Sequence, residues 1–98
     1  MGKFILSKST QDDIDDIFSY GTTHFGNTIA IEYLVELNSC FTMLAEQPGA
    51  GRNRDEIKRG LLSFPFKSHI IFYRVFKDHI RIVRVFYGGR DLVKAFRS

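Results

Sequence analysis

The sequence contains little of what marks secreted, membrane-spanning or metal-binding chains. Cys40 is the only cysteine, which excludes a disulfide within the chain, and no Cys/His group has the spacing of metal ligands. The N-terminus holds only three consecutive apolar residues, at positions 4–6, so it resembles neither a signal peptide nor a membrane span. We therefore expect a cytoplasmic chain with no metal, no cofactor and no association with a membrane.

Tryptophan is absent, and two prolines and eight glycines are too few for a linker or a low-complexity tail. Ten phenylalanines and four tyrosines supply the bulky side chains that a core needs. With 44% apolar and 26% charged residues, the composition is typical of a globular protein, and 98 residues predict a single domain spanning positions 1–98.

Basic residues are scarce in the first half of the chain and abundant in the second. Residues 1–51 contain two lysines against seven Asp and Glu, whereas residues 52–98 contain twelve Lys and Arg against four Asp and Glu. All eight arginines lie in the second half: Arg52, Arg54, Arg59, Arg74, Arg81, Arg84, Arg90 and Arg97. Because a concentrated positive field attracts anionic surfaces, we expect the second half to meet an anionic partner.

The first half predicts a helix that ends at Gly26. Ser9 or Thr10 is expected to cap its start, which places Asp12 and Asp13 in the first turn. Carboxylates in that turn favour the positive end of the helix dipole. Gly26 is expected to end this helix, because glycine readily adopts the left-handed backbone conformation found after many helices.

A second helix is expected to start near Asn27 or Thr28 and to end before Pro48. Its apolar residues recur at helical spacing for four turns. The short link through Gly26 predicts an antiparallel helix hairpin. Ahead of both helices, the apolar run at residues 4–6 predicts a brief strand.

The second half predicts strands. Residues 48–60 form a polar, Gly-rich connection with room for one helical turn. Segments 61–65, 69–77 and 79–87 are rich in Phe, Ile, Val and Tyr, with a turn at residues 77–78. The last apolar segment is expected to add an edge strand or to pack over the sheet.

This order of elements predicts an α+β fold, in which a helix hairpin packs on one face of a three-stranded antiparallel meander. A two-residue turn at 77–78 also predicts which residues face each other across the last two strands. The expected pairs are Phe76 with His79, Val75 with Ile80, Arg74 with Arg81, Tyr73 with Ile82, Phe72 with Val83, Ile71 with Arg84 and Ile70 with Val85.

Both faces of this predicted sheet are apolar, although a small antiparallel sheet normally leaves one face polar. The helix hairpin covers only one of them, so the C-terminal segment, a partner chain or both must cover the other. Arg74 opposite Arg81 would bring like charges together, which costs a few tenths of a kcal/mol or more. An anionic partner would relieve that repulsion.

The ordered motifs of the chain resemble the ParE toxins of the RelE/ParE superfamily. The resemblance covers nearly the whole sequence, and the ordered set of motifs is specific. It is carried by Tyr20, Phe25, Gly26, Ala30, Tyr33, Leu37, Pro48, Gly51, Arg52, Glu56, Ile57, Gly60, Leu61, Phe64, Pro65, Phe66, Ser68, residues 69–74, Ile80, residues 82–85, Tyr87, Arg90 and Asp91.

The resemblance implies the toxin of a type II toxin–antitoxin module, with growth arrest and plasmid stabilisation as its outcomes. It implies DNA gyrase as the target, and a ParD-type antitoxin whose acidic, partly disordered C-terminal segment folds over the toxin. Two positions depart from many relatives, which carry Arg in place of Leu62 and His in place of Tyr87. Both lie in the region expected to meet a target.

The residues expected to contact antitoxin or target are Arg59, Arg74, Arg81, Arg84, Tyr87 and Arg90. Direct sequence-specific DNA binding is not expected, because no recognition helix is apparent and both helices are acidic or neutral. A further hypothesis is that the chain is an inactive relative that still binds the antitoxin.

The superfamily also contains ribonucleases of the RelE type, which cut messenger RNA in the ribosome. Such a reaction needs a base, an acid and cations on the phosphate. Glu56 or His69 would serve as base, Arg81 and Arg84 as phosphate clamps, and Tyr87 as acid. Isolated residues of these types more often have structural roles or are simply solvated, so we prefer a toxin with no catalytic residues.

Overall fold

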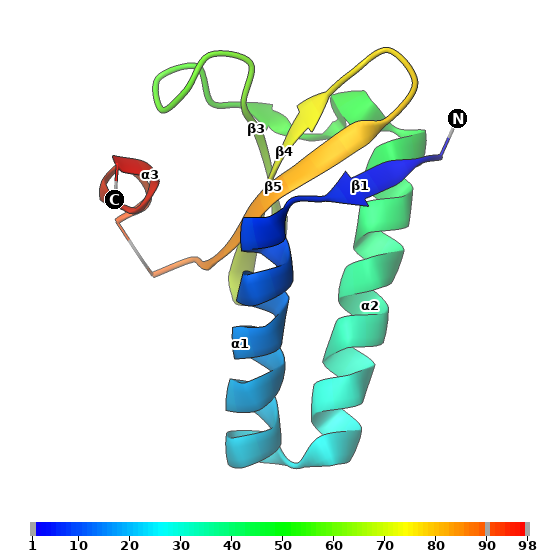
Figure 1. Ribbon diagram of the computed structural model, residues 1–98, viewed down its shortest axis with the longest axis vertical. Coiled ribbons are helices and arrows are strands. Elements are labelled where there is room, and N and C mark those ends of the chain that lie inside the picture. Colours follow the sequence, from blue (N-terminus) through cyan, green and yellow to red (C-terminus); the bar gives the residue numbers. More distant parts are fainter. Residues whose placement is uncertain (1, 90, 98) are drawn as a thin grey trace.

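The structure, a computed structural model, describes residues 2–89 and 91–97 and has an α+β architecture (Figure 1). Its elements in chain order are β1 (Phe4–Leu6), α1 (Lys8–Phe25), α2 (Asn27–Glu46), the 3-10 turn η1 (Pro48–Ala50), β2 (Arg52–Asn53), β3 (Leu62–Phe66), β4 (His69–Val75), β5 (Ile80–Tyr87) and α3 (Leu92–Arg97). The predicted fold class, helix hairpin and antiparallel meander are confirmed.

The sheet has five strands in the order β1-β5-β4-β3-β2, two more than the meander predicted from the sequence. β1 joins one edge by pairing parallel to β5, and the two-residue β2 joins the other edge antiparallel to β3. A parallel neighbour requires a long connection, and β1 is separated from β5 by the α1–α2 hairpin and by β2, β3 and β4. Two residues are too few for a period-2 pattern, so β2 is not visible in the sequence.

Helix α1 begins two residues earlier than predicted, so the expected cap at Ser9 or Thr10 is wrong. Ser7 is the N-cap: its backbone is extended, and its Oγ accepts a hydrogen bond from Thr10 N at 3.0 Å. Ser7 N also donates to Ile82 O, which ties the start of the helix to β5. Asp12 and Asp13 consequently lie beyond the first turn.

Gly26 lies between the two helices, as predicted. Its φ of 88° is in the left-handed region that favours glycine, and its N–H donates to Thr22 O. In Figure 1 the two helices run antiparallel and project well beyond the sheet. None of the helices in the described residues is long and apolar enough to cross a membrane.

The predicted register of β4 and β5 is confirmed near their turn and wrong beyond it. Arg74 pairs with Arg81, Tyr73 with Ile82 and Val75 with Ile80 as expected. A β-bulge at Val83 then shifts the pairing by one residue on β5. Phe72 therefore faces Arg84 rather than Val83, Ile71 faces Val85 rather than Arg84, and Ile70 faces Phe86 rather than Val85.

The two sheet faces carry separate cores. The helix-side core, between the sheet and the α1–α2 hairpin, consists of Leu37, Phe41, Leu44, Ala45, Ile71, Tyr73, Ile80, Ile82 and Val85. The α3-side core, on the opposite face, consists of Leu61, Phe72, Phe86 and Ala95. The C-terminal segment thus packs over the sheet as a short helix and does not form the edge strand that was the other expectation.

Tyr73 links the helix-side core to the polar connection after α2. Its hydroxyl donates to Pro48 O at 2.8 Å and accepts from Gly51 N at 2.8 Å. Burial raises the pKa of this hydroxyl. A side chain at Gly51 would collide with the Tyr73 hydroxyl, so glycine is required where the chain passes this close. This anchor fixes the loop that leads to β2 and β3.

Candidate functional site

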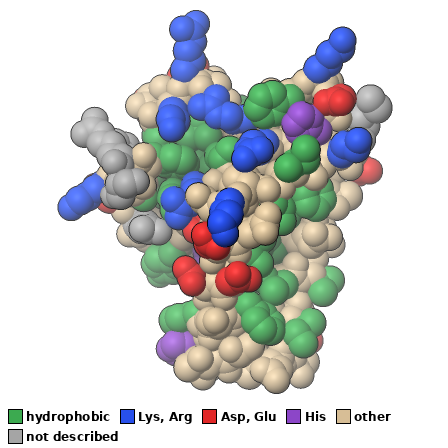
Figure 2. Space-filling model, viewed as in Figure 1, with side chains coloured by type: hydrophobic (Ala, Val, Ile, Leu, Met, Phe, Trp, Pro, Cys, Tyr) green, Lys and Arg blue, Asp and Glu red, His purple; other side chains and the backbone are tan. Residues whose placement is uncertain are grey.

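The cationic side chains gather at the sheet end of the molecule. Figure 2 shows Lys and Arg side chains over the upper half of the view and none on the lower part of the helix hairpin. This distribution follows the sequence, because the hairpin comes from the acidic first half and most of the sheet from the basic second half. The chain therefore presents a positively charged region to a partner.

Three of the residues predicted as contacts form an arginine face, defined here as Arg59, Arg74 and Arg81. Arg74 and Arg81 lie directly opposite each other on β4 and β5. Their side chains share the face of Phe72 because alternate strand residues point the same way. Arg74 Nη1 donates to Arg59 O at 2.8 Å. Arg59 and Arg81 are exposed, so this face is accessible to a partner.

The loop that presents Arg59 is held by two hydrogen bonds within its own turn. Asp55 Oδ1 accepts from Gly60 N at 2.8 Å, and the Asp55 backbone N donates to Asn53 Oδ1. The bond from Gly60 is the main reason that the pKa of the Asp55 carboxyl is lowered. Gly60 has a φ of 81°, which permits the turn before β3. The loop is therefore shaped before any partner arrives.

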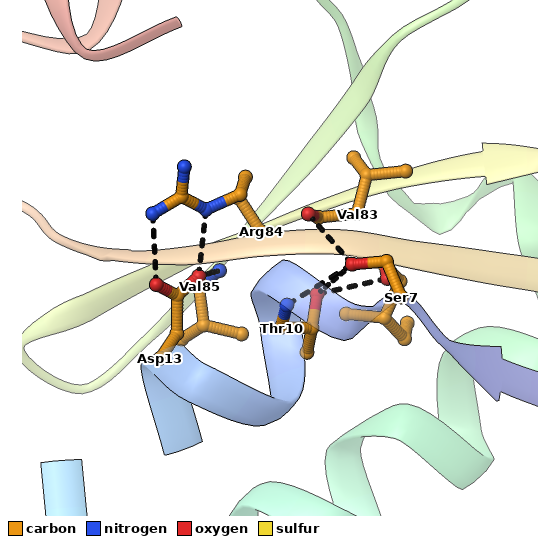
Figure 3. A network of polar contacts seen from close by, with 7 residues as sticks. Ser7, Thr10, Asp13, Val83, Arg84 and Val85 are labelled. Carbon is orange, nitrogen blue, oxygen red and sulfur yellow. Dashed lines mark hydrogen bonds and ion pairs between the residues drawn. The ribbon is translucent and has the colours of Figure 1, made fainter. Parts of the chain in front are cut away.

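Arg84 differs from the arginine face because it already has a partner within the chain. Its Nε and Nη2 donate to the two carboxylate oxygens of Asp13 at 2.9 and 2.8 Å (Figure 3). The Asp13 side chain is 11% exposed and that of Arg84 29% exposed. Donation of these hydrogen bonds to Asp13 raises the pKa of Arg84, whose guanidinium also lies 4.2 Å from the Phe86 ring centroid. Fork-shaped pairing of this kind orients a guanidinium firmly.

Asp13 belongs to a row of polar side chains on α1 that continues the edge of the sheet. β1 covers β5 only as far as Ile82. From that point on, Thr10 Oγ1 donates to Ile82 O at 2.9 Å and Ser7 Oγ donates to Val83 O at 3.0 Å (Figure 3). Asp13 Oδ2 accepts from Val85 N at 2.9 Å. The spacing of three residues places Ser7, Thr10 and Asp13 on one side of the helix start, where all three contact the bulged part of β5.

A groove lies between the distal half of the hairpin and the end of β5. This hairpin groove has a volume of about 660 Å³. Its lining includes Asp16, Tyr20, Ile29, Tyr33, His69 and Tyr87. The groove is thus formed by both helices of the hairpin and by β4 and β5, which are distant from them in sequence.

His69 and Tyr33 form the polar part of the hairpin groove. The Tyr33 hydroxyl and His69 Nδ1 are 2.6 Å apart. Burial lowers the pKa of His69, against an opposing effect of the Asp13 charge, and burial raises the pKa of Tyr33. Tyr87 lies opposite His69 in the register, with ring centroids 6.2 Å apart, and is 60% exposed. A neutral histidine and two phenols therefore line one wall.

The structure brings together only some of the residues considered for a ribonuclease. His69 and Tyr87 are neighbours in the hairpin groove. Arg81 lies near the other end of β5, and Glu56 lies in the loop after β2, where it pairs with Arg54 at 3.4 Å. Arg90, a further predicted contact, lies outside the described residues. Of the two departures from the family pattern, Leu62 packs against the helix-side core, and Tyr87 is at the groove.

Several groove residues were missed by the sequence reasoning. The sequence predicts for Asp13 only a place in the first turn of a helix, and it assigns no functional role to Asp16, Ile29 or Tyr33. The one usable signal was the row of carboxylates at positions 12, 13, 15 and 16, two of which lie on the groove side of α1. Their arginine and histidine neighbours are more than 50 residues away in sequence, so spacing alone could not pair them.

Comparison with known proteins gives a consistent result. Residues 4–92 match the family described as ParE toxin of type II toxin-antitoxin system, parDE. The chain is 33% identical to Toxin ParE1 of Caulobacter vibrioides, over 93% of this chain and 94% of that protein. It is 32% identical to Toxin ParE1 of Mycobacterium tuberculosis, over 92% of this chain and 93% of that protein.

The fold of this chain resembles those of solved structures. A chain of the chromosomal ParDE TA system from P. aeruginosa superposes with a TM-score of 0.70 at 20% identity, covering 89% of this chain and 96% of that chain. The solution structure of a conserved hypothetical protein from Helicobacter pylori superposes with a TM-score of 0.53 at 17% identity, covering 92% of this chain and 98% of that chain.

Proposed function

The chain belongs to the ParE toxin family of type II toxin–antitoxin systems, and from that membership we propose that it arrests growth by binding and inhibiting DNA gyrase. The observation that carries the proposal is the family match over residues 4–92. The arginine face supports it, because Arg81 on β5 and Arg59 in the loop before β3 are both exposed. Inhibition then requires binding alone and no catalytic residue.

The test is a supercoiling assay with purified gyrase and the purified protein. We expect loss of supercoiling, or accumulation of gyrase–DNA cleavage complexes, at a near-stoichiometric ratio. Arg81→Glu should weaken the inhibition, whereas Lys8→Glu makes the same charge change on α1, outside the arginine face, and should not. Full gyrase activity in the presence of excess toxin would refute the proposed target.

The neutralising partner in this proposal is a ParD-type antitoxin with an acidic C-terminal segment. Such a segment would cover the arginine face and relieve the repulsion between Arg74 and Arg81. Tyr87, Arg84 and Arg90 also remain proposed contacts of the antitoxin or the target. Titration of the toxin with the antitoxin encoded beside it should give tight binding that weakens as salt rises. If no complex forms at low salt, the proposal of this partner is refuted.

A second candidate function is ribosome-dependent cleavage of messenger RNA. The observation that favours it is the contact between the rings of His69 and Tyr87 in an accessible groove. It predicts primer-extension stops within translated codons after induction of the toxin. If induction leaves growth, messenger RNA and gyrase unaffected, the chain is instead an inactive relative that retains antitoxin binding.

A further inference from the structure

The end of the sheet beside the β4–β5 turn carries two stacked rings at the surface. Phe76 and His79 have ring centroids 5.0 Å apart and an interplanar angle of 11°. The backbone keeps them paired, because Phe76 N donates to His79 O at 2.9 Å. His79 Nδ1 lies 2.7 Å from Asp78 Oδ1, and this contact restrains the imidazole. Phe76 is 47% exposed, so the pair offers an accessible aromatic surface.

The strand register places these rings on the same sheet face as two arginines. Alternate residues of a strand point to the same side, so His79 shares a face with Arg81. Phe76 likewise shares it with Arg74, which pairs with Arg81. β1 adds Ile5, whose partner on β5 is Arg81 and which is 44% exposed. The turn-end surface is defined here as Lys3, Ile5, Phe76, His79 and Arg81.

The positive charge of the turn-end surface is only partly neutralised within the chain. Arg81 is exposed and forms no ion pair among the described residues. Lys3 is also exposed, and its backbone oxygen accepts a hydrogen bond from Ile80 N. The pKa of Asp78 is lowered mainly by its hydrogen bond with His79 and also by the charge of Lys3. Asp78 therefore offsets Lys3 and leaves the charge of Arg81 for an external anion.

Free cations beside an exposed aromatic pair match the chemistry of a single-stranded nucleic acid. Figure 2 shows hydrophobic and His side chains next to Lys and Arg side chains at the upper right, where Figure 1 has the β4–β5 turn. Phosphates pair with the cations, and unpaired bases stack on aromatic rings. A duplex offers the phosphates, but its bases already stack on each other. An acidic protein segment would pair with Arg81, but its carboxylates gain nothing from the rings.

We propose that the turn-end surface binds a short single-stranded nucleic acid segment. One base stacks on the Phe76–His79 pair, and Arg81 and Lys3 hold the adjoining phosphates. Stacking tolerates any base, so the site needs no recognition helix. The contact is one of binding alone, and the hairpin groove takes no part in it. The proposal depends on neither gyrase nor the antitoxin, so it is tested separately from the function proposed above.

The test measures the fluorescence anisotropy of labelled oligo-dT and oligo-rU strands of about 12 nucleotides with the purified toxin. A DNA duplex of the same length provides phosphates without free bases. Phe76→Ala and Phe25→Ala form a matched pair, because both rings are exposed and Phe25 ends α1, outside the turn-end surface. Arg81→Gln and Lys8→Gln each remove one exposed positive charge, and Lys8 lies on α1. Circular dichroism checks that all four variants are folded.

We expect single strands to bind more tightly than the duplex by about fivefold or more. Phe76→Ala should weaken single-strand binding by about tenfold and leave its salt dependence unchanged, because a stacked base is lost and no charge is removed. Arg81→Gln should weaken binding by about threefold or more and flatten the plot of log affinity against log salt by about 0.7, the value for one phosphate contact on a single strand. Phe25→Ala and Lys8→Gln should stay within about twofold of the unsubstituted toxin.

The comparison of strands also identifies the source of the ligand. Tighter binding of oligo-dT assigns the site to DNA, tighter binding of oligo-rU assigns it to RNA, and either result upholds the site. If neither strand binds at low salt, the proposal is refuted, and a loss of gyrase inhibition in Phe76→Ala would then assign the surface to a protein target. If the duplex binds as tightly as the single strands, or Phe76→Ala binds as tightly as Phe25→Ala, stacking of a base is refuted.

Discussion

On one face the sheet carries helices of 18 and 20 residues, and on the other it carries one helix of six. The helix-side core buries nine residues, among them Phe41 and Tyr73, whereas the α3-side core buries four. Arg74 and Arg81 lie on the side of the smaller core, and the Arg84 guanidinium lies over Phe86 of that core. We therefore expect the larger core to supply most of the stability, and the smaller one lies beside the surface that we propose for a partner. The predictions below test that division.

The largest effect is expected where the helix hairpin meets the sheet. Phe41 is 1% exposed, and its ring centroid lies 5.5 Å from the ring centroid of Phe4. Phe41→Ala removes this ring from a closed core, so we expect a loss of about 3–5 kcal/mol in the free energy of unfolding. Urea denaturation followed by circular dichroism measures it. A loss below about 1 kcal/mol would show that the helix-side core is not the main source of stability.

A substitution of Asp13 tests the hydrogen bonds that join α1 to β5. Asp13→Ala leaves the Arg84 guanidinium and the Val85 N–H without their acceptor, so we expect a loss of about 2–3 kcal/mol. The figure is below that for a fully buried pair because Arg84 is partly exposed. Asp15→Ala, at an exposed position of the same helix, should change stability by no more than about 0.5 kcal/mol. Equal effects of the two substitutions would contradict a specific role for the ion pair.

The corresponding substitution on the opposite face should cost less. Phe96 of α3 packs its ring against Phe72 and Phe86, with centroids 4.8 and 5.3 Å away, but remains partly exposed. We expect Phe96→Ala to lower the free energy of unfolding by about 1–2 kcal/mol, less than for a fully buried ring. Binding of a hydrophobic dye should rise as the sheet face opens. A loss as large as that of Phe41→Ala would remove the distinction between the two faces.

The elements near the hairpin turns were predictable from the sequence, because local signals determine them. Gly26 marked the boundary between the helices, and the turn at residues 77–78 gave the correct pairing of Arg74 with Arg81. Both depend on backbone preferences within a few residues. The same local signals gave the α+β class, since helix and strand periodicities occupy separate halves of the chain.

Features that depend on distant contacts were not predictable. The bulge at Val83 is stabilised by Ser7 from the other end of the chain, and no strand pattern indicates it. Arg84 was predicted to bind a partner, yet Asp13, 71 residues away, already holds it. Ser7 caps α1 because β1 leads directly into the helix, which only the sheet pairing reveals. Arginines can be counted in a sequence, but their free or paired state is a property of the fold.

A smaller effect is expected from pH, through His69 on the helix-side face. Its pKa in the folded protein is lowered by burial, while the unfolded chain takes up the proton near pH 6.5. The folded state therefore binds fewer protons below that pH, so stability is full above about pH 6.5 and falls as the pH drops toward the folded pKa. The nearby Asp13 charge opposes the lowering, and Tyr33 holds Nδ1.

Thermal melts between pH 5 and 8 measure this dependence, and His69→Gln serves as the comparison. The substituted protein should lose stability less steeply below pH 6.5, because the titrating group is gone. Carboxylates elsewhere contribute equally to both proteins, so the difference between the two curves isolates His69. Parallel curves would show that this histidine titrates alike in the folded and unfolded states.

The smallest effect is expected on the arginine face, and its sign is reversed. Arg81 lies opposite Arg74, and like charges in directly opposed positions destabilise a sheet. Arg81→Gln should therefore raise the free energy of unfolding by a few tenths of a kcal/mol at low salt. The gain should shrink as salt rises, because exposed charges are screened. Lys58→Gln removes the same charge from an exposed loop position without an opposed arginine and should give no gain. If Arg81→Gln instead destabilises the toxin, the arginines support the fold, and the second sheet face is not reserved for a partner.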